Sequence, residues 1–459
     1  MRARPGIAPS AAAGLLLLAM LAPTSADDRG GEPQGLLDIY EIAREQDPQL
    51  RGQGFAVEEL RESRRESFGR LLPQVTASGE ISRTRREQTS TNVAGDEEGI
   101  TRNFTLEQYG VNLSQPLLDI PAYRRYQGAG RELDQGQYEI RAARQDLISR
   151  VAEAYLEVLS AQSQEVLAER EVEAVESSFE QVQGLYDEGL AAVTELEEVR
   201  ARRDSARAAL LRAESDVTVA QERLYELTGQ HHTRLAGLDA AATLPEIEPM
   251  ELDQWVERAE ERNPQIQAAL VGLDATRHEM RAARAERYPT VSLTAGYSHR
   301  DELDGTRFGR EFDDLSIGVQ VSMPLYQGGQ IYARARGAQQ RQYREQEDLE
   351  RTRRGVHAEV RSAFLSLRSA RREIQAQQQA VRSNERNVEA MEAGFEAGER
   401  PVVDVVDAQR DLFQAERELA ELRYAYLMDV FALRRGAGVL DGGDIADLDR
   451  LFTAVPGVE

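Results

Sequence analysis

The sequence contains no cysteine and no lysine, and all 56 of its basic residues are arginine. The absence of cysteine excludes disulfides, thiolate metal sites, cysteine nucleophiles and a lipid-modified N-terminal cysteine. The 80 acidic residues among 459 give the chain a formal net charge of -24. Because contacts to nucleic-acid phosphates need a basic surface, we expect no nucleic-acid partner.

Long apolar runs are scarce, and the most apolar one lies near the N-terminus. Arg2 and Arg4 precede a leucine-rich run at 14–21, and small residues follow it at 24–26. This order is typical of a secretory signal peptide, which we place at 1–26. An N-terminal membrane anchor is the alternative, but the run is short for about 30 Å of hydrocarbon. No later stretch reaches about 18 consecutive apolar residues, so any membrane-spanning segments would have to be strands.

The rest of the chain consists of two similar halves. Pro48 and Pro73 recur 216 residues later as Pro264 and Pro289. A second set of matches recurs 208 residues later, pairing Gly110, Val111, Ser114, Pro116 and Leu117 with Gly318, Val319, Ser322, Pro324 and Leu325. Self-similarity of this kind indicates structural repeats. We place the first repeat at 27–229, an inter-repeat segment at 230–251, the second repeat at 252–438 and a C-terminal tail at 439–459.

The spacing of proline predicts long helices in both halves. Proline is absent from 122–244 and from 325–400, and these stretches are rich in Ala, Glu, Arg, Gln and Leu. Within 147–161 two adjacent apolar seams repeat at helical spacing, which indicates neighbours on two sides. A helix of about 65 residues is about 100 Å long, so a rod, tube or bundle is expected. We predict long helices over about 119–187, 192–228, 328–397 and 402–436.

Alternating apolar and polar residues predict one strand pair in each half, preceded by a helix. In the first strand Val75, Ala77 and Ile81 alternate with polar residues. Phe104 falls out of phase with Tyr109, which predicts a bulge or a later start in the second strand. The stretches 86–102 and 301–311 are polar and are expected as loops. We predict strands over about 74–86, 103–115, 289–300 and 312–323.

Each predicted strand has one apolar face, and no helix is obviously placed to cover that face. A four-stranded soluble sheet under a helical layer is the alternative. Four strands cannot close a barrel, which begins at about eight. An uncovered apolar sheet in a secreted chain therefore indicates an oligomeric β-barrel in a membrane, continued by a helical bundle in water.

Three segments resemble the TolC family of outer-membrane efflux and type I secretion channels: 186–195, 325–329 and 391–408. The resemblance covers essentially the whole mature chain. It implies a mixed α and β membrane protein, a homotrimer with a twelve-stranded outer-membrane barrel, four strands coming from each chain. It also implies an α-helical tunnel through the periplasm and a mixed equatorial region formed by the inter-repeat segment and the tail.

The same resemblance implies a function. The trimer would be a passive exit duct for tripartite multidrug efflux, type I protein secretion or both, in the outer membrane of a Gram-negative bacterium. Its partners would be a periplasmic adaptor protein, an inner-membrane transporter and outer-membrane lipid. The duct would be gated at its periplasmic end by an ionic latch and an acidic ring.

The latch implied by the resemblance joins Glu195 and Arg400. Phe395 stands where the family has a tyrosine that contributes a hydrogen bond, and phenylalanine cannot make that bond. Glu195 also replaces a shorter aspartate. We therefore expect a gate that is less tightly locked than is usual in the family.

The acidic ring is expected from Asp404 and Asp407, which share a helix face. Three copies would place six carboxylates around one constriction, where they would concentrate cations. On the residues alone, both acids also suit the first turn of a helix after Pro401, where the helix dipole favours negative charge. The two interpretations are compatible.

Two glycines, Gly189 and Gly398, are expected as helix C-caps at tight turns. The resemblance adds that the turns at 189–194 and 398–403 contact the adaptor protein. The contact residues implied in this way are Gly189, Leu190, Thr194, Gly398 and Val403.

No catalytic constellation is recognisable, and we expect no enzyme activity, cofactor or metal. His278 and Glu279 begin like a zinc-protease motif, but Ala282 stands where the second histidine is required. His231 and His232 are expected as surface residues in a turn. Two other classes remain open. A soluble periplasmic coiled-coil scaffold would leave the four apolar-faced strands unexplained, and an extracellular enzyme would need polar groups converging on a pocket.

Overall fold

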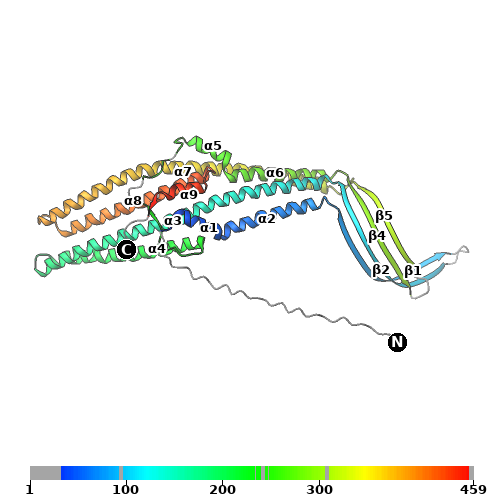
Figure 1. The fold of residues 1–459 in the computed structure, drawn as a ribbon, viewed down its shortest axis with the longest axis horizontal. Coiled ribbons are helices and arrows are strands. Elements are labelled where there is room, and N and C mark those ends of the chain that lie inside the picture. The colour runs from blue at the N-terminus through cyan, green and yellow to red at the C-terminus, as the bar shows by residue number, and fades with distance from the viewer. Residues whose placement is uncertain are drawn as a thin grey trace, which may run out of the picture.

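The chain forms a long rod of helices with a four-stranded sheet at one end (Figure 1). The computed structural model describes residues 33–91, 97–232, 234–238, 243–246, 248–304 and 310–453. The predicted signal peptide, 1–26, lies outside the described residues.

The two halves have the same order of elements. The first half contains α1 (Leu36–Gln46), α2 (Pro48–Gly69), β1 (Gln74–Thr91), β2 (Glu97–Leu118), α3 (Ile120–Asp187) and α4 (Val193–Thr228). The second half contains α5 (Leu252–Arg262), α6 (Pro264–Ala285), β4 (Thr290–Asp304), β5 (Arg310–Ser322), α7 (Gln330–Glu396) and α8 (Val402–Gly436). Three short elements complete the chain: β3 (Gly237–Leu238), α9 (Gly442–Asp449) and β6 (Phe452–Thr453).

Two short helices precede each hairpin, where the sequence analysis expected one. The second helix of each pair starts at a proline, which has no N–H to leave unsatisfied at a helix start. In the first half Asp47 caps α2 by accepting hydrogen bonds from the backbone N–H groups of Gln49 (2.6 Å) and Leu50 (3.3 Å). Asn263 caps α6 in the same way. An acceptor side chain followed by proline is therefore what divides these helices.

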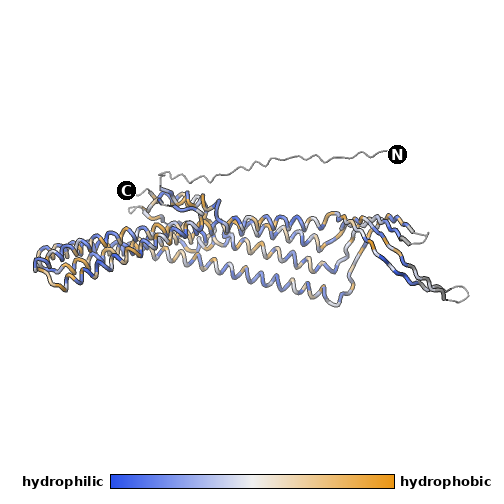
Figure 2. Tube along the Cα trace, turned by 90° about the horizontal axis from the view of Figure 1, so that it is seen from below, coloured by the Kyte–Doolittle hydropathy of each residue, from blue (hydrophilic) through white to orange (hydrophobic). Residues whose placement is uncertain are grey.

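The four strands form one antiparallel sheet in the order β1-β2-β4-β5. Val111 lies opposite both Ala77 and Tyr297, so odd-numbered side chains share one face. On β5 this face carries Leu315 and Ile317, which are 79% and 75% exposed. Figures 1 and 2 show the sheet beyond the ends of the helices. The strands also extend into both polar stretches that were expected as loops.

The irregularity expected near Phe104 is not there. The pairing of β1 with β2 is continuous through this position, and Phe104 simply lies on the opposite face from Tyr109. Its buried ring has the guanidinium of Arg86 at 5.0 Å from its centroid. The register of β2 instead shifts between Pro116 and Leu118.

The main hydrophobic core lies in the middle of the rod, where α3 meets helices of both halves. Both apolar seams predicted on α3 are buried in it: Leu147, Val151 and Val158 from one, and Ile148, Tyr155 and Leu159 from the other. In the described part of the chain, no helix combines the length and apolar character needed to cross a bilayer.

An equatorial collar, formed by the inter-repeat segment and the C-terminal tail, packs against this core. There β3, from the inter-repeat segment, pairs with β6, from the C-terminal tail. The hydroxyl of Tyr155 donates a hydrogen bond to the carbonyl of Ala236 (2.7 Å), and its ring meets Phe452 edge-on. The inter-repeat segment and the C-terminal tail thus both pack against α3.

One collar residue, His232, corrects an expectation. It was expected on the surface but is buried, with ring nitrogens bonded to Gln34 Oε1 (2.7 Å) and Thr228 Oγ1 (3.0 Å). Burial lowers the pKa of His232 below its ordinary value, and the adjacent His231 adds to the effect. His231 itself is exposed and stacks on Tyr225.

Replacing Asp47 with alanine should lower the free energy of unfolding by about 2 kcal/mol. The carboxylate is almost fully buried, caps α2 and lies 2.5 Å from the guanidinium of Arg150, so the change leaves two backbone donors unsatisfied and Arg150 with only its second carboxylate partner, Asp146. Asp47→Asn retains the cap and should cost less. Denaturant unfolding followed by circular dichroism measures the effect. The exposed first-turn acid Asp253 provides the control, and an Asp47→Ala variant as stable as Asp253→Ala would contradict the assignment.

Mild acid should loosen the collar through His232. The folded pKa lies below the unfolded value of about 6.5, so the unfolded chain binds the proton more readily. The stabilising contribution is present above pH 6.5 and is lost as the pH falls below it. Unfolding midpoints measured between pH 7.5 and 5 should fall more steeply for the wild type than for His232→Gln. Equal slopes would refute the role of His232, and His231→Gln serves as the matched control.

Candidate functional site

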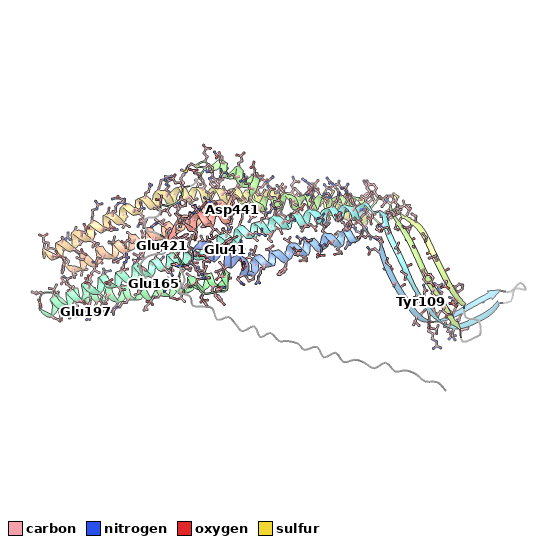
Figure 3. The ribbon with its side chains drawn as sticks, viewed as in Figure 1. Glu41, Tyr109, Glu165, Glu197, Glu421 and Asp441 are labelled. Atoms are coloured by element: carbon pink, nitrogen blue, oxygen red, sulfur yellow. The ribbon has the colours of Figure 1, made fainter. Side chains whose placement is uncertain are left out.

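The end of the rod opposite the sheet, which we call the tip, is formed by the α3–α4 and α7–α8 turns (Figure 1). Figure 3 places Glu197 of α4 near this end and Tyr109 in the distant sheet. Gly189 and Gly398 occupy equivalent places in the two turns, with φ of 76° and 72°. This left-handed conformation is the one expected of C-cap glycines.

The two turns close with the same backbone hydrogen bonds. The N–H of Leu190 donates to the carbonyl of Leu185 at 2.8 Å, and the N–H of Glu399 donates to the carbonyl of Gly394 at 2.8 Å. A Cβ atom added at Gly189 or Gly398 would meet nothing within 4 Å. The glycines are thus required by backbone conformation and not by crowding.

A small apolar cluster joins the two helix pairs just behind the turns. We call it the tip cluster, and its buried members are Val175, Val182, Leu196, Val199, Val402 and Val406. Phe395 packs against it, which gives this side chain an apolar role in place of the hydrogen bond that it cannot make. Val403, expected in an adaptor contact, also packs against the cluster, whereas Leu190 is 72% exposed and Thr194 is exposed.

The predicted latch is not closed within this chain. Arg400 lies in the turn just before α8, and its Nη1 is 3.2 Å from Oδ2 of Asp404 in the first turn of α8. Glu195 lies in the first turn of α4, and the described residues contain no ion pair between it and Arg400. Arg400 therefore pairs with a carboxylate of the helix that follows it.

The two carboxylates expected in an acidic ring both contact arginines. Asp404 contacts Arg400, and Asp407 Oδ1 lies 3.0 Å from Arg202 Nη2 and 3.8 Å from Arg410 Nη1. Arg202 belongs to α4, so its pair with Asp407 crosses between helices. Arg202 could not be identified from the sequence, because no local pattern connects two residues this far apart in the chain.

Aromatic contacts also hold α4 against α3 near the tip. The guanidinium of Arg203 lies 4.2 Å from the ring centroid of Phe179, a cation–π geometry. Phe179 in turn packs against the tip cluster. The position of α4, and with it that of Arg202, is thus set by contacts with α3.

Two further groups resemble metal ligands. His278 lies on α6 with Asp274 at 4.0 Å. On the sheet, ligand atoms of His299, Glu311 and Asp313 lie within 4.8 Å of one another. His299 Nδ1 bonds to Asp313 Oδ1 at 2.9 Å, and these internal bonds account for the arrangement.

Replacing Gly398 with alanine should destabilise the tip by about 1 kcal/mol, because an L-residue in the left-handed region clashes with its own backbone. Gly355 provides a control of opposite sign. It lies in the interior of α7 with open space around a built Cβ, so Gly355→Ala should stabilise by up to about 1 kcal/mol. Hydrogen exchange of the α8 amides measures the first effect, and thermal unfolding measures the second. If both variants were destabilised, or both stabilised, the special role of the left-handed conformation at Gly398 would be contradicted.

Comparison with known proteins identifies the family to which this chain is similar. The family model described as "Outer membrane efflux protein" matches residues 39–230 and 255–439. The outer membrane protein TolC of Vibrio cholerae is 31% identical over 91% of this chain and 93% of its own length. The proteases secretion protein PrtF of Dickeya chrysanthemi is 30% identical over 93% of each chain. The solved structure of the Campylobacter jejuni CmeC outer membrane channel superposes with a TM-score of 0.77 over 98% of each chain, at 17% identity. The chain belongs to the outer membrane efflux protein family.

Proposed function

We propose that three copies of this chain close a channel through the outer membrane and continue it as a helical tunnel into the periplasm. The channel is a passive exit duct for efflux, protein secretion or both. The observation that carries the proposal is the sheet, which has an exposed apolar face and two open edges.

The edges determine how copies must join. In the described part of the chain, β1 and β5 each pair on one side only. Since β5 runs antiparallel to β1, the edge of one copy continues the antiparallel order of the next. Four strands are too few to close, whereas three copies supply twelve strands and leave no edge.

The apolar face has the dimensions and borders of a lipid-facing band. β5 spans 13 residues, more than the roughly 10 that a tilted transmembrane strand needs. Toward the hairpin ends the face passes from aliphatic residues to Tyr109 and Tyr297, and then to Glu107, Asp301 and Glu311. Tyrosine is favoured at membrane–water interfaces, so the tyrosines indicate where the hydrocarbon ends.

The names of the relatives support the choice of cargo. The family name indicates efflux, and the name of PrtF indicates protease secretion. No catalytic step is part of the proposal, so the energy for export comes from an inner-membrane transporter coupled through a periplasmic adaptor. The exposed Leu190 and the open space around both turn glycines leave room for the adaptor at the tip.

The gate is proposed at the same tip. Because the described residues of one chain contain no Arg400–Glu195 pair, the latch is assigned to the trimer, where Arg400 of one chain meets Glu195 of a neighbouring copy. Phe395 supplies apolar packing but no hydrogen bond, so fewer polar restraints oppose opening. Engagement of the adaptor moves α7 and α8 outward and widens the constriction.

Single-channel conductance of the mature protein in a planar bilayer tests the proposal. The wild type should show a low conductance that rises in Arg400→Ala, because the latch is lost. Arg351→Ala, which removes an exposed local pair on α7, should leave it unchanged. An equal conductance in Arg400→Ala and wild type would keep the channel and remove the latch. Folded, oligomeric protein without conductance would favour the coiled-coil scaffold.

A further inference from the structure

We infer that Arg202 sets the charge of the constriction: it neutralises Asp407 while the tip is closed and exposes that charge when the tip opens. This inference rests on the proposed function. It assigns a selectivity-determining role to a residue of α4, outside the helix that carries the acidic ring.

The pair lies at the rim of the tip cluster. Val199, one turn before Arg202 on α4, is fully buried, and Val406, next to Asp407 on α8, is 1% exposed. The side chains of Arg202 and Asp407 are 34% and 39% exposed. The apolar contacts therefore bring the two charges together at the border between packed interior and water.

The carboxylate depends on its arginines. Asp407 Oδ1 is shielded from solvent and accepts no hydrogen bond of good geometry in the described residues. Arg202 Nη2 at 3.0 Å and Arg410 Nη1 at 3.8 Å supply its electrostatic compensation. A shielded carboxylate oxygen without a counter-charge is unfavourable, so loss of Arg202 contact favours exposure of Asp407 to water.

Arg202 differs from the other arginines in being on another helix. Arg410 belongs to α8 and Arg400 lies in the turn directly before it, so both stay beside Asp404 and Asp407 when α8 moves. Arg410 also contacts Asp411 at 3.1 Å, which divides its charge between two acids. Arg202–Asp407 is the ion pair that joins α4 to α8 in the described part of the chain. When α4 and α8 separate, Asp407 therefore loses its ion pair with Arg202. Asp404 keeps its ion pair with Arg400.

The consequence is a ring whose charge depends on its state. In the closed tip Asp404 and Asp407 each have an arginine, so the ring attracts cations weakly. In the open tip three Asp407 carboxylates lose their partners from α4 and face the pore. Rings of acidic side chains attract cations, so cation selectivity and cation block should increase with opening.

The first experiment tests the pair without requiring a channel. Hydrogen exchange of the 402–410 amides is measured in the full mature protein for Arg202→Ala, Asp407→Asn and the double variant. Each single variant should exchange about threefold faster, the scale of half-exposed ion pairs, and the double variant should be no faster than either. Arg212→Ala, which removes the same charge from an exposed position of α4, should change nothing. Multiplying effects in the double variant would overturn the inference.

The second experiment tests the charge of the pore. Arg202→Ala should raise the bilayer conductance and lower the concentration of hexamminecobalt(III) that half-blocks it, on the order of threefold. Adding Asp407→Asn should restore the wild-type block while the conductance remains high. An unchanged block in Arg202→Ala would overturn the inference. Coupling in the exchange experiment combined with a wild type that never conducts would instead refute the proposed function, and the pore role of Arg202 with it.

Discussion

A strand that enters lipid must have every backbone N–H and C=O group hydrogen-bonded, and the rest of this structure depends on that constraint. One chain satisfies its inner strand pairs but leaves the outer edges of β1 and β5 open. When several copies join to close the barrel, they also arrange the helices around it, because β2 ends at Leu118 and α3 begins at Ile120. With so little chain between them, helices attached to a closed ring of strands must themselves surround its axis.

The two repeats share a backbone plan but anchor it with different chemistry. Asp47 holds the first helix break through an ion pair with Arg150 of α3. At the equivalent break Asn263 donates a hydrogen bond to the carbonyl of Gly436 at the end of α8 (2.9 Å). An ion pair thus attaches the first helix break to α3, and a neutral hydrogen bond attaches the second break to the last turn of α8.

Periodic features of the fold were predictable from the sequence. The seams of α3 and the apolar strand faces repeat every few residues, so local sequence is sufficient to identify them. The helix breaks also have a local sequence signal, an acceptor side chain directly before proline, but this signal was overlooked. Burial of His232 and the pairing of Asp407 were beyond reach, because each depends on a residue roughly two hundred positions away, Gln34 and Arg202. Only packing of the whole chain brings such partners together.

The open edges have a genetic consequence. In a ring in which β1 of each copy pairs with β5 of the next, the interface is heterologous: two different surfaces of the chain meet. Every copy therefore contributes two different edges. A copy with a sound β1 and a damaged β5 could still join one neighbour and would leave the ring unsealed. In a cell making equal amounts of sound and damaged chain, random assembly gives about one-eighth intact trimers. Alleles that damage one edge strand would therefore behave as dominant, whereas alleles that prevent folding altogether would behave as recessive.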